Sequence, residues 1–410
     1  MKHWIKLLTG SLLGVFLGFF LPQNIPELSA ALTWLERLVI SIGRYAVVPV
    51  LFFSLSISVY ELRQDGKFWG LLLRSLLTMA AGAVFIISAG ILAVFLFPPS
   101  RIQISNEEQI AAVSLGTLDS ILEIFPSNML AALTGGGVYL LPVCVFAVFL
   151  GIGLSGDRNQ TKPVITLIDS LSHIFYYIVS VLSDVVALLF VILSAYWAVR
   201  YRAVLADGKF RDLILLLGGL SGVLGLAVMP LLLYALKPRM NPWAALYGSF
   251  GPALTAFFSG DVNFTLPVLM RHVKENLGVR RRANALTLSL FSVFGRAGSA
   301  MTAAVSLIVI ISSYSSLEIT RADILSIGIR ACVISFLLFR HPGDGAYTAL
   351  AVLCAGYSGE YKAGYLNLRP LAFFLTATGA FLDVMFASFA SCAIARKSGL
   401  QEARHPRHFI

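Results

Sequence analysis

The chain has few charged residues and few cysteines for its length, and each scarcity excludes a class of protein. Charged side chains make up 13% of the 410 residues, whereas soluble domains contain roughly 25%. Because 58% of the residues are hydrophobic, a water-soluble fold could not bury the apolar surface. The four cysteines show no Cys-x-x-Cys spacing, so neither a disulfide framework nor a zinc site is predicted, and we interpret them as packing residues.

Motifs that carry enzyme chemistry are also missing. The sequence contains no His-Glu-x-x-His, no Gly-x-Ser-x-Gly and no phosphate-binding Gly-x-x-x-x-Gly-Lys-Ser/Thr pattern. We therefore expect neither an enzyme nor a bound cofactor. The net charge of +10 comes from Lys and Arg residues in short loops rather than along one polar face, so nucleic acid is not an expected partner.

Long apolar runs dominate the first half of the chain. Their length matches a helix that crosses the bilayer, about 20 residues, and their continuity excludes the alternating strands of outer-membrane barrels. The sequence thus predicts an all-α polytopic membrane protein embedded in a lipid bilayer, and we interpret the first run as a retained helix. The six uninterrupted runs lie near 7–22, 38–60, 69–97, 129–154, 164–200 and 212–236.

The second half is built differently, because its apolar runs between 241 and 395 are short and interrupted. The interruptions are Gly260-Asp261-Val262-Asn263, Gly295-Arg296-Ala297-Gly298 and His341-Pro342-Gly343-Asp344-Gly345. Broken helices at membrane depth are tolerated only where protein or a cavity satisfies the freed backbone groups. These segments therefore predict a solute-binding site.

The distribution of positive charge predicts the orientation. Most basic loops agree with a cytoplasmic (inner) membrane protein whose N- and C-termini are both cytoplasmic. His272, Lys274 and the run Arg280-Arg281-Arg282 are interpreted as part of this cytoplasmic positive cluster. One loop disagrees, since this orientation places four basic residues outside: Arg200, Arg202, Lys209 and Arg211.

Several stretches, in order and spacing, resemble the dicarboxylate/amino acid:cation symporter family, which includes the glutamate transporter homologues. The resemblance runs from about Leu7 to Lys397 and identifies the chain as a divergent member. The stretches that carry it are Val48-Pro49-Val50-Leu51-Phe52-Phe53-Ser54-Leu55, Phe125-Pro126-Ser127-Asn128 with Leu141-Pro142, Leu254-Thr255-Ala256-Phe257, Thr265-Leu266-Pro267-Val268 with Lys274-Glu275, Pro342-Gly343-Asp344-Gly345-Ala346 and Phe381-Leu382-Asp383.

The resemblance implies eight transmembrane helices plus two re-entrant helical hairpins, a homotrimer, and a transport domain that slides as an elevator. Residues 1–240 would be mainly scaffold and trimerisation helices, with helices 3 and 6 joining the transport domain, and 241–398 would form its core. Within that core we expect hairpin 1 at about 242–278, a broken helix 7 at 283–312, hairpin 2 at 326–358 and helix 8 at 366–397, before a cytoplasmic tail at 399–410.

The chain departs from the family where the family binds its ligands. Phe386-Ala387 replaces the Arg-Thr pair of the final helix, Ala390 replaces an Asn, and Ile394 replaces an Asp. The family's unwound Asn-Met-Asp-Gly is Gly295-Arg296-Ala297-Gly298 here. Ala297, Ala390 and Ile394 offer no side-chain oxygen to sodium, so the family's sodium ligands are largely absent and any metal is unknown. Phe386 cannot capture a carboxylate as a planar guanidinium does.

The same region gains ionisable residues, and two interpretations stay open. In one, Arg296 receives an anionic substrate while Asp383, Asp261 or His341 handles a proton. In the other, Arg296 forms a structural pair with Asp383 or Asp261. A histidine side chain ordinarily changes charge near physiological pH, which makes proton coupling through His341 one interpretation; a capping or packing role is the other. Asp344 could be a site residue or merely solvated.

The sequence therefore predicts a secondary active transporter of a small anionic or zwitterionic solute, such as a dicarboxylate or an amino acid. Its coupling is altered, with the proton and sodium both open as the coupling ion. The alternatives are a sodium-coupled glutamate or aspartate symporter, an uncoupled exchanger, or a transport-inactive sensor that keeps the fold. Candidate substrate-binding residues are Asp261, Val262, Asn263, Thr265, Arg296, Gly298, Pro342, Gly343, Asp344, Gly345, Asp383, Phe386, Ala387 and Ala390.

Overall fold

A computed structural model describes residues 2–22, 25–102, 122–134, 136–156, 158–236, 241–314, 320–357, 359–402, 404 and 406–410. Within these ranges the regular structure is helical, and the only β-type pairing is an isolated bridge between Val279 and Gln401. The expected all-α class is confirmed.

The first half contains long helices, some of which are longer than the apolar runs that predicted them. The second run is preceded by an amphipathic stretch, so the path through α2 and α3 covers 39 residues, Pro26–Gln64. Helix α7 has 50 residues, about 75 Å at 1.5 Å per residue, which is more than twice the hydrocarbon thickness of a bilayer. The bounds are α1 His3–Phe20, α2 Pro26–Arg44, α3 Val47–Gln64, α4 Phe68–Leu96, η1 Met129–Thr134, α6 Leu141–Gly153, α7 Arg158–Asp207, α8 Arg211–Gly222, η2 Val223–Val228 and α9 Met229–Leu236.

The second half forms shorter helices whose breaks coincide with the interruptions in the sequence. Helices α10 and α11 form the first hairpin, α12 and α13 the broken helix, and α14 with α15 the second hairpin. Their bounds, with those of the last helices, are α10 Pro242–Ser259, α11 Val262–Glu275, α12 Arg281–Phe294, α13 Ala297–Tyr314, α14 Arg321–Leu337, η3 Leu338–Arg340, α15 Gly345–Ala355, η4 Gly359–Leu371, α16 Ala372–Lys397 and η5 Pro406–His408.

Eight stretches of the described chain are long and apolar enough to cross a membrane. Their number matches the expected eight helices, but one of the eight stretches is not one of the helices that were expected to cross the membrane. The stretch Arg321–Arg340 belongs to the second hairpin, whereas the expected fourth helix contains only the shorter apolar helix Leu141–Gly153. The chain is a multi-pass membrane protein.

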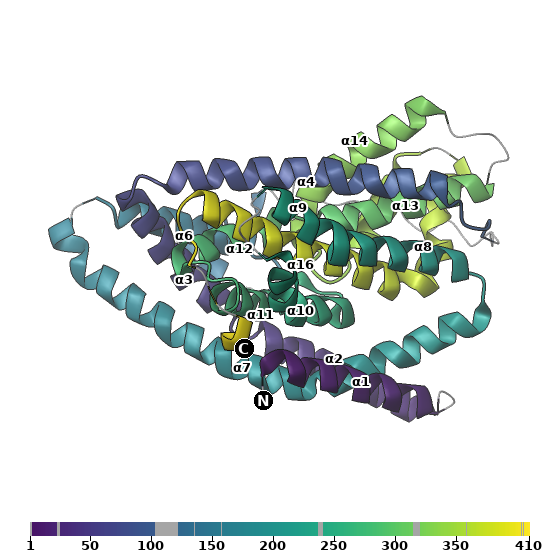
Figure 1. Cartoon of the computed structure of the whole chain (residues 1–410), viewed down its shortest axis with the longest axis horizontal. Coiled ribbons are helices and arrows are strands. Elements are labelled where there is room, and N and C mark those ends of the chain that lie inside the picture. Colours follow the sequence, from purple (N-terminus) through teal and green to yellow (C-terminus); the bar gives the residue numbers. More distant parts are fainter. Residues whose placement is uncertain are drawn as a thin grey trace.

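The broken helices lie inside the molecule. Figure 1 shows α13 and α16 in the middle, between α4 along one side and α10 on the other, while α7 follows the opposite edge together with α1 and α2. Helix α13 packs against α4, α15 and α16, and α10 packs against α11 and α16. This packing places the breaks of both hairpins and of the α12–α13 helix within the protein core.

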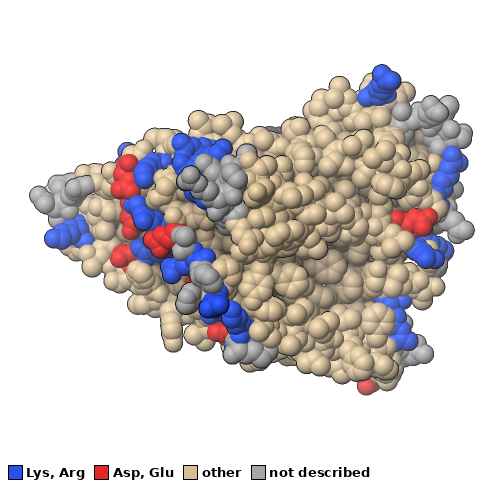
Figure 2. Space-filling view, viewed as in Figure 1, with Lys and Arg blue, Asp and Glu red and all other residues tan. Residues whose placement is uncertain are grey.

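Charged side chains avoid the middle of the face seen in Figure 2. Figure 2 shows Lys, Arg, Asp and Glu residues gathered toward the two ends of the visible face, with a broad uncharged region between them. In the basic loop that disagreed with the expected orientation, Arg202 has a local partner. Its Nη1 donates to the carbonyl of Phe19, 2.7 Å away, at the C-terminal end of α1, where a cation is favoured. A local structural role therefore accounts for one of its charges.

Candidate functional site

The tip of hairpin 1 is a two-residue turn between α10 and α11. Gly260 has a φ of +64°, in the left-handed region that favours glycine, and its N–H donates to the Ala256 carbonyl. Asp261 then caps α11, because its Oδ1 accepts from the N–H groups of Asn263 and Phe264 at 2.8 and 3.0 Å. The Gly-Asp pair thus ends one helix and begins the next.

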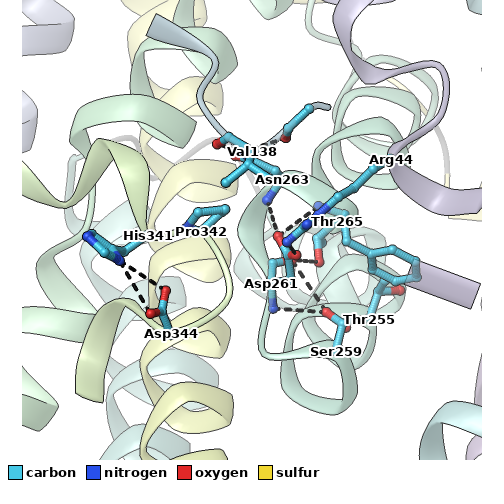
Figure 3. Close-up of polar contacts among 12 residues, drawn as sticks. Arg44, Val138, Thr255, Ser259, Asp261, Asn263, Thr265, His341, Pro342 and Asp344 are labelled. Atoms are coloured by element: carbon cyan, nitrogen blue, oxygen red, sulfur yellow. Dashed lines mark hydrogen bonds and ion pairs between the residues drawn. The ribbon is translucent and has the colours of Figure 1, made fainter. Parts of the chain in front are cut away.

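Asp261 is buried and forms an ion pair with Arg44, at the C-terminal end of α2. Figure 3 shows the guanidinium reaching Asp261 from the side away from His341 and Asp344. Gly343 of hairpin 2 lies close by, since a Cβ added to it would be 3.5 Å from both Arg44 Nη2 and Asp261 Oδ2. The pair therefore joins α2, hairpin 1 and the tip of hairpin 2.

The two hairpin tips touch directly through their backbones. The Val262 N–H donates to the Pro342 carbonyl at 3.2 Å. Asn263 faces another segment, because its Nδ2 donates to the carbonyls of Gly137 and Val138 at 3.0 and 2.8 Å. Thr265 closes the first turn of α11 with a 2.8 Å bond from its Oγ1 to the Asp261 carbonyl.

Arg296 occupies the break between α12 and α13 and is only 2% exposed. Its Nη2 donates to the carbonyls of His341 and Pro342 at 2.6 and 3.0 Å, and its Nε lies 3.9 Å from Asp383 Oδ2. Its Nε and Nη1 are buried without a hydrogen-bond acceptor among the described residues. A buried cation thus holds the tip of hairpin 2 and retains unused donors.

Asp383 caps α13 from the neighbouring helix α16. Its Oδ1 accepts from the Gly298 and Ser299 N–H groups at 2.7 and 3.3 Å, and its Oδ2 accepts from Ser299 Oγ at 2.6 Å. A carboxylate is favourable at a helix N-terminus. Because of this cap, α13 already begins at Ala297, so the break is two residues long rather than the four expected.

The tip of hairpin 2 carries its own polar cluster. His341 Nδ1 lies 3.3 Å from each carboxylate oxygen of Asp344, and Thr348 Oγ1 donates to Asp344 Oδ2 at 3.0 Å. The Asp344 side chain remains 61% exposed. Gly345 starts α15 against Arg296, where an added Cβ would lie 3.0 Å from Nη2. Glycine therefore lets the helix terminus approach the guanidinium.

A cavity of about 260 Å³ lies beside the two tips. Gly260, Gly343 and the carboxylates of Glu36 and Asp344 border it. The remaining wall is largely aromatic and joins α7, α10, hairpin 2 and α16 through Tyr196, Trp197, Phe257, Phe258, Tyr347 and Phe373.

Three candidates on α16 sit in packed surroundings. Phe386, Ala387 and Ala390 are all buried. The Phe386 ring packs against Phe291, with the centroids 5.4 Å apart, and against Gly82 of α4. The structure therefore brings Asp261, Arg296, the hairpin 2 tip and Asp383 into one contact network, whereas the Phe386 ring faces α4 and α12.

Sequence reasoning missed one member of this contact network. Arg44 pairs with Asp261, and the available signal was a charged residue inside the apolar run at 38–60. The interpretation of His272 as part of a cytoplasmic positive cluster was wrong. Its side chain is 1% exposed and contacts His3, because hairpin 1 folds back against α1.

Comparisons with known proteins agree with this architecture. The model of the sodium:dicarboxylate symporter family matches residues 4–393. Excitatory amino acid transporter 4 of Rattus norvegicus is 26% identical over 261 residues, covering 62% of this chain and 46% of that protein. The serine/threonine transporter SstT of Streptococcus agalactiae serotype III is 24% identical over 306 residues, covering 72% and 71%.

The similarity is broad but distant. An excitatory amino acid transporter of Caenorhabditis elegans is 23% identical over 412 residues, covering 86% of this chain and 80% of that protein. The alignment spans less than half the length of the rat transporter. The family model, by contrast, extends over nearly the whole chain. On this ground the protein belongs to the sodium:dicarboxylate symporter family.

Proposed function

We propose that the protein is a secondary active transporter of a small solute that carries a carboxylate, either a dicarboxylate or an amino acid. The solute binds between the two hairpin tips, and Arg296 supplies its counter-charge. The observation that carries this proposal is the buried guanidinium at the break between α12 and α13.

The hydrogen bonding of Arg296 supports the proposal. A buried donor without an acceptor costs about 1–3 kcal/mol, and more when the group is charged. Two guanidinium nitrogens are in this condition, while the third is held by hairpin 2 carbonyls. Withdrawal of the hairpin 2 tip frees that nitrogen and makes room, and a solute carboxylate then satisfies the donors.

The coupling ion we propose is the proton. A sodium ion beside Asp383 would meet a carboxylate whose two oxygens already accept three hydrogen bonds, with the Arg296 guanidinium 3.9 Å away. Ala390 and Ile394, at positions where the family has ligands, are buried apolar side chains. Asp261, His341 and Asp383 remain the candidate proton carriers near the solute.

We further propose that transport follows an elevator mechanism in a homotrimer, in the cytoplasmic membrane with both termini inside. These points rest on the family resemblance, as does the assignment of 1–240 mainly to the scaffold and 241–398 to the transport domain. Ion pairs that cross that boundary include Arg44 with Asp261, Arg281 with Asp169 and Arg271 with Asp184. Sliding would require these pairs to break, so they set part of its energy barrier.

The test is uptake by purified protein in liposomes, with a panel of labelled organic acids and amino acids. We expect uptake of at least one carboxylate solute, driven by a proton gradient and little changed when potassium replaces sodium. Strictly sodium-dependent uptake of acidic amino acids would overturn the proposed coupling. Absence of uptake and of solute-induced thermal stabilisation across the panel would overturn the transport proposal.

The role of Arg296 has a matched test. Loss of one partner from a buried charge pair costs about 2 kcal/mol or more, so Arg296→Ala should weaken solute binding at least about 30-fold. Arg296→Lys keeps the charge without the planar fork and should retain part of the affinity. Arg211→Ala, an exposed arginine at the start of α8, is the control. Unchanged binding by Arg296→Ala would remove it from the site.

A further inference from the structure

Two buried histidines join hairpin 1 to the first helix, at a site separate from the hairpin tips. His3 begins α1 and His272 lies on α11, and their side chains are 3% and 1% exposed. His3 Nδ1 and His272 Nε2 are 3.0 Å apart. On its other side, His3 Nε2 lies 3.1 Å from the Ser183 carbonyl of α7. The pair therefore connects α1 and α7 to hairpin 1.

The carbonyl of Ser183 determines where the protons of His3 lie. A carbonyl oxygen can only accept, so His3 Nε2 must carry the proton that bonds to it. In a neutral His3 the Nδ1 atom is then an acceptor. His272 Nε2 must therefore carry a proton and donate it across the 3.0 Å contact.

Asn276 determines the protonation of the remaining nitrogen of His272, Nδ1, and also makes this imidazole neutral. The Ile410 N–H donates to Asn276 Oδ1 at 2.9 Å, which identifies the oxygen end of the amide. Asn276 Nδ2 then faces His272 Nδ1 at 3.0 Å and the Gly248 carbonyl at 3.1 Å. His272 Nδ1 is thus an acceptor, and the chain of hydrogen bonds is complete with both imidazoles neutral.

The charges around the pair oppose an additional proton. Lys6 of α1 and Arg271 of α11 both act on His3, and among the described residues the acidic side chain that faces it is Asp184 of α7. Asp184 is already shared, since it lies 3.2 Å from Lys6 Nζ and 3.5 Å from Arg271 Nη1. The Gly248 carbonyl of α10 lies 3.2 Å from His272 Nδ1 and would favour a proton there, but it already accepts from Asn276 Nδ2 at 3.1 Å. A third cation would find no unshared carboxylate among the described residues at this contact.

We propose that His3 and His272 form a proton-binding site that is empty while hairpin 1 is docked on α1 and α7, and that fills when the two separate. In water a histidine is protonated below about pH 6.5. Docking requires neutral imidazoles, so the contact is stable above this pH and weakens as the pH falls through it. Proton uptake is thereby linked to movement of hairpin 1 against the first helix, whatever solute the protein carries.

The test is hydrogen exchange of α11 amides at pH 7.5 and 5.5 in lipid nanodiscs, corrected for the pH dependence of the chemical exchange step. Each histidine that titrates only after undocking raises the open population about 10-fold over this interval. We expect a rise of about 100-fold in the wild type, about 10-fold in His272→Gln, and no rise in the double variant His3→Asn/His272→Gln. His173→Gln, a mostly exposed histidine of α7, is the control and keeps the wild-type rise.

A pH effect that survives in the double variant, or that disappears in the His173→Gln control, would overturn the proposal. If the double variant does not fold, ¹⁵N NMR of the histidines in the wild-type protein decides. At pH 7.5 two imidazoles should be neutral with the proton on Nε2, and they should become protonated over the pH range in which α11 exchange rises. Two imidazoles that stay neutral while exchange rises would be decisive against it. Neither measurement requires solute uptake, so failure of the transport proposal would leave this test intact.

Discussion

The outer and inner helices of this protein are both rich in apolar residues, but they differ in how much of that apolar surface is buried. In α1 and α4 only 33% of the residues in the most apolar window are buried, whereas the α12–α13 window is 89% buried and the η4–α16 window 78%. The outer helices are continuous and present large apolar side chains on their surfaces, such as Phe16 and Leu77. The inner ones are interrupted and enclose Arg296 and Asp383. These two buried charges thus lie in segments surrounded by protein.

The largest effect should come from Asp383, which is buried between α16 and α13. Asp383→Ala removes the counter-charge of Arg296 and the cap of α13, so we expect the free energy of unfolding in detergent micelles to fall by about 3–5 kcal/mol. Asp323→Ala, which removes the partly exposed carboxylate of the α14 capping box, should cost about 1 kcal/mol. Equal losses would show that burial does not distinguish the two carboxylates.

Arg44 should matter less, because its side chain is 21% exposed. Arg44→Ala leaves the Asp261 carboxylate with its two backbone donors, and we expect a loss of about 2 kcal/mol in unfolding free energy. Arg37→Ala, an exposed position on the same helix, is the matched control and should change it by less than about 0.5 kcal/mol. A silent Arg44→Ala would mean that the ion pair adds nothing to the docking of hairpin 1.

Two glycines of α4 compare its inner and outer faces. A Cβ on Gly82 would lie 2.0 Å from the Phe386 ring, whereas a Cβ on Gly70 would meet nothing within 4 Å. We expect Gly82→Ala to lower the thermal stability, at a cost of about 1–3 kcal/mol for overpacking. Gly70→Ala should raise it by up to about 1 kcal/mol through helix propensity. Stabilisation by both would show that α4 shifts freely on α16.

The smallest effect is expected on the outer face itself. Leu77 is 60% exposed and Leu71 is 1% exposed, although both lie on α4. Leu77→Ala should change the free energy of unfolding by less than about 0.5 kcal/mol, while Leu71→Ala should cost about 2 kcal/mol or more because it leaves a cavity. A larger loss at Leu77 would indicate that this face packs against another subunit instead of lipid.

Much of the fold could be predicted from local features. Gly260-Asp261 contains both the left-handed residue that ends α10 and the side chain that caps α11, so the first hairpin turn was evident in the sequence. The length of the break at Arg296 was not, because it depends on a carboxylate from another helix. Asp383 supplies the cap that starts α13 at Ala297.

The candidate site was predicted only in part, because its contacts also join residues that are far apart in the sequence. Arg296, Asp261 and Asp383 were recognised as unusual charges, and the structure gives each its partners. The structural pairing of Arg296 with Asp383 was one of the two interpretations, but the hydrogen bonds of Arg296 to the hairpin 2 carbonyls were not foreseen. Backbone acceptors leave no signature in a sequence, since every residue carries a carbonyl group.

The sequence by itself determined that this protein is helical, spans a membrane many times and interrupts its helices in the second half. These properties depend on single residues. Apolar side chains favour the lipid and charged side chains favour water, while Gly and Pro permit or force a break in a helix. Only the tertiary structure decided which charges meet. His3 and His272 are 269 positions apart in the chain, and their contact exists because hairpin 1 packs on α1.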